Sequence, residues 1–172
     1  MPLKARSIGK IGMLVGVLIG SFFITLWLTS PNRTDDRSPL ERLASSSISN
    51  RGDLVEAAIA AGMERAWRMK GNVDVIKRLN ERDVTTQGWL AVPWGGDERP
   101  LTLLIFVGGK KVAATQTRGE RPDVTKEFAL VNGAEKNVAF DVSFFCPTGA
   151  QPVFAGISPD NEYFFLRSFT CP

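Results

Sequence analysis

The chain contains no histidine, and this absence excludes most hydrolytic and zinc chemistry. Ser-His-Asp and Cys-His hydrolases lose their base, and zinc sites lose their commonest ligand. The two cysteines, Cys146 and Cys171, are too far apart in sequence to build a structural zinc site alone. The sequence also lacks a phosphate loop and a dinucleotide fingerprint. We therefore expect no enzyme activity, no cofactor and no metal ion.

Acidic residues are missing from the N-terminal part of the chain, where Lys4, Arg6 and Lys10 stand alone. Removing these three from the 21 basic residues leaves 18, which equals the 18 acidic residues that all lie after residue 30. The larger C-terminal part is therefore formally neutral. A neutral domain has no electrostatic footprint for phosphate, so we expect no binding of nucleic acid.

Charge of either sign is absent from Ile11 to Asn32, and this stretch includes one long apolar run. Its first 18 or so residues would make a helix of about 27 Å, which can cross a bilayer. We predict a transmembrane anchor over residues 11–29, with Trp27 suited to the headgroup boundary. The alternative is a cleaved signal peptide, but no small-x-small site directly follows the run and there is no lipobox cysteine. We favour the uncleaved anchor.

The basic tail, residues 1–10, predicts the orientation of this anchor. Basic flanks stay in the cytoplasm, so we expect a single-pass protein of a bacterial inner membrane with its C-terminal domain in the periplasm. Within the anchor, Gly12, Gly16 and Gly20 recur every four residues along one helix face. Such a strip lets a second helix approach closely, although three glycines can also align by accident. We expect contact with a membrane subunit or with a second copy of the chain.

A polar linker and a helix are predicted to follow the anchor. Residues 30–50 are rich in Ser, Pro and charge, which is typical of a linker. Residues 51–71 predict an amphipathic helix, because Val55, Ile59 and Met63 recur at helical spacing and Gly71 offers a stop. We expect that apolar face, continued by Ala66 or Trp67, to pack on the adjacent domain, although Met63 and Trp67 could also form a stripe for a partner.

Beyond this helix, residues 72–172 predict a β-sandwich of about seven strands. Gly108 and Gly109 predict a two-residue hairpin loop, and residues 121–128 predict one short helix that crosses between the two sheets. The expected strands cover 73–79, 84–92, 101–107, 111–117, 138–145, 152–157 and 163–169.

Three segments of this region carry a family resemblance. They are GWLAV at 88–92, PLTLLIFVGGKKVA at 100–113 and RGERPDV at 118–124. Their order resembles an immunoglobulin-like β-sandwich module of bacterial envelope proteins, sometimes found beside glycosyltransferase domains. The resemblance covers roughly residues 71–145. It implies a noncatalytic module without an agreed ligand. The anchor, the helix and both cysteines lie outside it.

Cys146 and Cys171 each follow an apolar strand, and in an outward-facing domain such a pair predicts a disulfide. We expect SPDNE at 158–162 to be a strand-connecting turn rather than a calcium loop. Asp97 and Glu98 are adjacent, so their side chains diverge and they form no acid-base pair.

Two functions remain open at this point. In the first, the chain is an accessory or structural subunit of an envelope complex, docking through the glycine strip and the sandwich. In the second, it is a tethered module that binds a glycan or a peptide through flat aromatic rings. Trp94, beside glycines, is the best single candidate contact, with Trp89 and Tyr163 as further rings, although a core position is the simpler expectation for Trp89. We favour the first reading because the sandwich shows no cluster of polar side chains around these rings.

Overall fold

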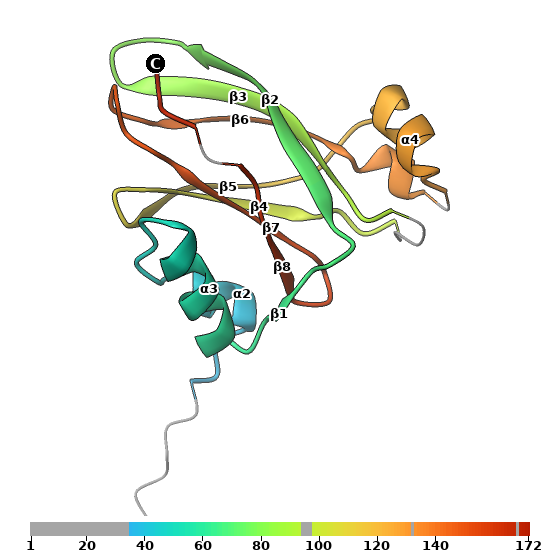
Figure 1. Cartoon of the computed structure of the whole chain (residues 1–172), viewed down its shortest axis with the longest axis horizontal. Coiled ribbons are helices and arrows are strands. Elements are labelled where there is room, and N and C mark those ends of the chain that lie inside the picture. The colour runs from blue at the N-terminus through green and yellow to red at the C-terminus, as the bar shows by residue number, and fades with distance from the viewer. Residues whose placement is uncertain (1–34, 94–97, 132, 168) are drawn as a thin grey trace, which may run out of the picture. The chain divides into compact units, whose positions relative to one another are not determined.

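The computed structural model describes residues 35–93, 98–131, 133–167 and 169–172. They form two β-sheets and a few helices, so the described chain is mainly β, as predicted (Figure 1). Within these ranges no helix is both apolar enough and long enough to cross a bilayer. The predicted anchor with Gly12, Gly16 and Gly20 lies outside the described residues, and so does Trp94.

Among the described residues all seven predicted strands are present, together with one short additional strand. The elements are β1 (Glu64–Arg65), β2 (Lys70–Arg78), β3 (Asp83–Ala91), β4 (Thr102–Val107), β5 (Lys110–Gln116), β6 (Ala139–Phe145), β7 (Val153–Ile157) and β8 (Glu162–Phe165). One sheet has the order β1-β8-β7-β4-β5 and the other the order β2-β3-β6. Every described pair is antiparallel except β1 with β8.

The two sheets share one core, because each presents an apolar face to the other. Val84 and Leu90 of β3 lie in the same buried cluster as Leu103 of β4 and Phe154 of β7. In the middle of this cluster the ring of Phe144 meets that of Phe154 edge-on, with centroids 5.8 Å apart. This packing arises from the alternation of apolar and polar residues in β3 and β6, which turns one face of the smaller sheet inward.

The five-stranded sheet is covered on its other face as well, by α2 (Pro39–Ala44) and α3 (Arg51–Ala60) (Figure 1). Leu43 and Leu54 of these helices are fully buried against Leu104 and Phe106 of β4. A strand buried on both faces cannot alternate with polar residues, which explains the unbroken apolar runs of β4 and β7.

The helix α2 lies inside the predicted polar linker, so that part of the prediction is wrong. Ser38 accepts a hydrogen bond from the amide of Glu41, whose carboxylate accepts from the backbone and hydroxyl of Ser38. This capping box starts the helix despite the polar composition. Ile48, later in the same stretch, is fully buried and pairs with Gly109. The compact unit therefore begins at Arg37 rather than after residue 50.

The predicted helix over 51–71 is also corrected, because α3 ends at Ala60. Gly62 adopts a positive φ of 77° and donates to the carbonyl of Ile59, while Met63 donates to that of Ala58. These two bonds form a Schellman stop, which needs glycine at that position. The buried face is also different, since Leu54, Ala58 and Ala61 are buried while Ile59 is 65% exposed.

Three further predictions are confirmed. Gly108 and Gly109, both at positive φ, close the two-residue loop between β4 and β5. The helix α4 (Pro122–Phe128) leads from β5 in one sheet to β6 in the other. Cys146 and Cys171 form the predicted disulfide.

Candidate functional site

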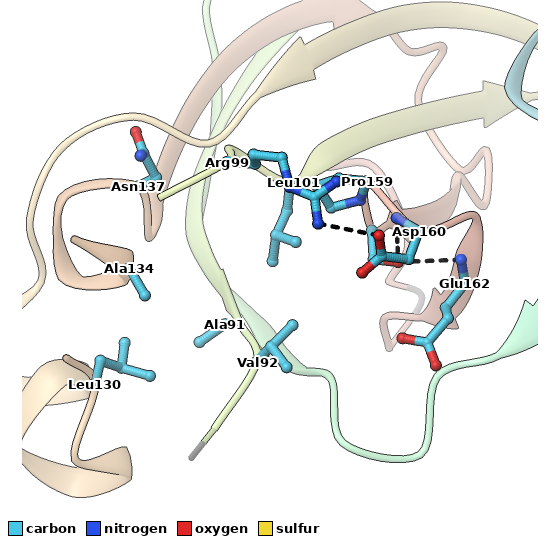
Figure 2. Close-up of a pocket in the computed structure, with 11 residues that line it drawn as sticks. Ala91, Val92, Arg99, Leu101, Leu130, Ala134, Asn137, Pro159, Asp160 and Glu162 are labelled. Carbon is cyan, nitrogen blue, oxygen red and sulfur yellow. Dashed lines mark hydrogen bonds and ion pairs between the residues drawn. The ribbon is translucent and has the colours of Figure 1, made fainter. Parts of the chain in front are cut away.

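A small pocket in the described part of the chain lies between the segment before β4 and the turn that joins β7 to β8 (Figure 2). Its volume is about 70 Å³, which suits a few waters rather than an organic ligand. The walls combine apolar and polar side chains and come from Ala91, Val92, Arg99, Leu101, Leu130, Ala134, Asn137, Ser158, Pro159, Asp160 and Glu162.

An ion pair spans part of this pocket. The guanidinium of Arg99 lies 3.0 Å from the carboxylate of Asp160, and both side chains are more than half exposed. Exposed pairs of this kind contribute little to stability. Asn137 donates from its side-chain amide to the carbonyl of Glu98, at 2.5 Å. Both contacts hold the segment before β4 against its neighbours. This structural role accounts for both without a ligand.

Ser158 contributes a buried hydroxyl to the pocket, and the hydrogen bonds of this hydroxyl are those that stabilise a turn. Its oxygen accepts from the backbone amides of Asp160 at 3.3 Å and Glu162 at 3.0 Å. Among the described residues, no lysine or carboxylate side chain forms a hydrogen bond with this hydroxyl, and the chain has no histidine. The hydroxyl therefore has no neighbouring base there that would activate it as a nucleophile. SPDNE at 158–162 is thus the strand-connecting turn that the sequence predicts.

Metal binding finds no support in the part of the chain that the structure describes. There, no three side chains of the metal-binding acidic or cysteine types come close enough to share an ion. Asp160 and Glu162 lie near Glu64 at the β7–β8 turn, yet Arg99 already neutralises Asp160.

A wider groove runs between β5 and β6, where the edges of the two sheets approach each other, and it is open to solvent. Its volume is about 680 Å³. The carboxylate of Asp141 on β6 accepts from Thr85 at 3.2 Å and from Gln87 at 2.8 Å. The charged group that β6 contributes is therefore already engaged with β3.

Of the aromatic residues that the sequence proposes as ligand contacts, the structure describes Tyr163 and Trp89. Tyr163 is buried in the core under α3, so its ring cannot meet a ligand. Trp89 is half-buried at the edge of a smaller buried cluster, where it packs on Phe128 with ring centroids 5.4 Å apart. Trp94, the best single candidate contact from the sequence, lies outside the described residues.

One strong charge cluster fixes α4 to the smaller sheet. Arg121 donates two bonds to the carboxylate of Asp123, at 2.9 and 2.7 Å, and one to Asp74 of β2, at 2.6 Å. The bond from Arg121 lowers the pKa of Asp123 to about 2, and the same carboxylates raise the pKa of Arg121. Asp74 itself lies where the β2–β3 register shifts. The cluster joins helix and strand and needs no ligand to explain it.

Trp67, which the sequence predicts on a helix face packed on the domain or open to a partner, is an exposed aromatic residue. Trp67 is 77% exposed in the connection between β1 and β2, where the sequence predicts a helix. The guanidinium carbon of Arg65 lies 4.7 Å from its ring centroid. The arginines on either side of Trp67 in the sequence are the signal that could have drawn attention to it.

Comparison with family models, with curated proteins and with solved structures gives no match for this chain.

Proposed function

We propose that this chain is a noncatalytic, single-pass envelope protein that acts as an accessory or structural subunit of a membrane complex. A glycine-faced helix would dock in a bacterial inner membrane, and an immunoglobulin-like domain would contact a partner in the periplasm. The observation that carries the proposal is a disulfide-closed two-sheet domain whose compact unit begins at Arg37, a few residues after the apolar run ends.

The strand order supports the immunoglobulin-like part of the proposal. Counting from β2 as the first strand, the smaller sheet contains strands one, two and five, and the larger contains seven, six, three and four in that order. Immunoglobulin sandwiches pair A with B and E in one sheet and C with F and G in the other. Here the fourth strand, β5, joins the C-F-G sheet beside β4. The disulfide is not the usual link between strands B and F, so it serves a different purpose.

The disulfide supports the periplasmic location. Disulfides form and persist in oxidising compartments and are rare in the cytosol. The bond between Cys146 and Cys171 therefore agrees with a domain exported across the membrane.

The alternative is a tethered module that binds a glycan or a peptide. It draws on Trp94 and on the open groove between β5 and β6. The burial of Tyr163 weakens it, because a glycan platform needs several accessible rings.

Co-purification of the full chain in mild detergent tests the proposal. We expect a membrane protein in fixed stoichiometry, and we expect Gly16→Ile to lose it because a branched side chain blocks close helix approach. Leu18→Ile, on another face of the same predicted helix, is the matched control. A chain that purifies alone and is retained on polysaccharide would support the alternative instead.

A further inference from the structure

The connection between β1 and β2 holds an exposed tryptophan in a fixed position. Trp67 is 77% exposed, yet its neighbours Ala66 and Met69 are 3% and 1% exposed and belong to the core between the sheets. The backbone on both sides is therefore anchored. The indole is presented to solvent by the fold rather than by a loose chain end.

The segment that holds this indole is rich in cations. Arg65 stacks on its ring, and Arg68 and Lys70 are exposed in the same segment. Glu64 is the only acid between residues 64 and 70, and it adjoins Arg65 in β1, where successive side chains point to opposite faces of a sheet. Arg65 and Trp67 therefore share a surface from which Glu64 is directed away.

The neighbouring helix makes a second contact between an arginine and an aromatic ring. Arg51 of α3 lies over the ring of Phe165 in β8, the strand that pairs with β1. We call Arg65, Trp67 and Arg68 of the β1–β2 connection and its preceding strand the basic aromatic patch.

We propose that the basic aromatic patch docks on the anionic headgroup layer of the membrane that holds the predicted anchor; this inference rests on the proposed function. Amphipathic indole rings favour the headgroup region, and arginines near an anionic surface are attracted to it. Arginine stacked on tryptophan offers both features at one point.

Chain length also favours a lipid surface over a distant partner. Eight peptide steps separate Thr29, the last residue of the predicted span, from Arg37, and they reach at most about 28 Å. The β1–β2 connection begins at the same end of the domain as α2 (Figure 1). Arg42 of α2 donates to the carbonyl of Ala61 at 2.7 Å, just before β1. A tether of this length keeps Arg37 within about 28 Å of the predicted span, and the attraction acts once the patch comes within about 8–10 Å of the headgroups.

The test uses the full chain in vesicles of phosphatidylcholine and phosphatidylglycerol, with bromine on the lipid tails just below the headgroups. Emission from Trp67 is obtained as the difference between the wild-type chain and Trp67→Phe. We expect this component to be quenched, and the quenching to weaken in vesicles without phosphatidylglycerol. Arg65→Gln and Arg68→Gln should each lower the ratio of docked to undocked domain about fivefold.

Phe145→Ala and Lys77→Gln are the matched controls, because they alter an exposed aromatic residue and an exposed cation on the smaller sheet. They should leave the quenching unchanged. A chain that resists alkaline extraction while its Trp67 emission stays unquenched would overturn the docking and leave the anchor in place. A chain released by alkaline extraction would overturn the anchor and the docking together.

Discussion

Gly88 faces the core between the sheets in the middle of β3, where any side chain would collide with its neighbours. A Cβ atom there would overlap the backbone oxygen of Asn72 and lie 2.5 Å from the ring of Phe140. The ring fills the space that the missing side chain leaves. The close contact between β2, β3 and β6 therefore requires glycine at position 88, whose side chain is a single hydrogen atom.

We therefore expect Gly88→Ala to destabilise the domain by about 1–3 kcal/mol, through overpacking and displacement of β2. Thermal unfolding of the full chain in detergent, followed by near-ultraviolet circular dichroism, measures the effect. Lys77→Ala, at an exposed position of the adjacent strand β2, should change stability by less than about 0.5 kcal/mol. Equal stability of the two variants would contradict this account of Gly88.

Asp123 gives a pH-dependent prediction at the same scale. Its folded-state pKa of about 2 lies below the ordinary 3.8, so its bond to Arg121 stabilises the fold above about pH 4 and is lost as the pH falls toward 2. We expect Arg121→Gln to return the carboxyl pKa of Asp123 toward its ordinary value. Titration followed by the side-chain carbon resonance of Asp123 checks this. An unchanged pKa in Arg121→Gln would show that another group holds it low.

At the scale of elements, strands were easier to predict from the sequence than helices. Alternation in β3 and β6 and glycines in the β4–β5 loop are local signals, and the structure confirms them. The helix α3 was predicted too long because its periodicity continues past Gly62 in the sequence, whereas the positive φ of that residue ends it. The helix α2 was missed because the Ser, Pro and charged residues around it are typical of a linker, and the capping box at Ser38 and Glu41 was not recognised.

The burial of α2 leads to the third prediction. Leu43→Ala should cost about 2–5 kcal/mol, because the side chain is fully buried against the five-stranded sheet. Ile59→Ala on α3 is the control and should cost less than about 0.5 kcal/mol, since Ile59 is mostly exposed. Thermal melts of the two variants decide the question. A small loss for Leu43→Ala would mean that residues 37–50 behave as the linker that the sequence suggests.

At the scale of the whole molecule, the pairing of strands distant in sequence could not be predicted from residue patterns. Alternation shows which face of a strand is buried, but not that β7 lies beside β4 or that β6 joins β3. The candidate pocket was equally hidden, because it forms where Arg99 and Asp160 meet from separate segments. The disulfide was predictable because the chain has two cysteines, so that only one pairing within the chain is possible.

That disulfide gives the fourth prediction. Replacing Cys146 and Cys171 together by alanine should cost about 3.5 kcal/mol in the chain-entropy model for a separation of 25 residues, or about 10 °C in melting temperature. Arg78 donates to the carbonyls of Pro172 and Cys146, so the C-terminal segment should remain partly held. Melting curves of the variant and of the reduced wild-type chain should agree. Melting of either at the temperature of the oxidised wild type would contradict the stabilising role.

Because α2 and α3 lie over the larger sheet, the domain resists a mechanical pull weakly when the force is applied at its N-terminal side. The described chain joins the sheet beneath these helices through apolar side chains and the bridge of Ile48 to Gly109, rather than through a long ladder of strand bonds. A pull applied at Arg37 would therefore peel the helices away one contact at a time, before any strand has to shear. Tension from the N-terminal side would thus bare the apolar surface of β4 and β7 while the sandwich itself stays intact.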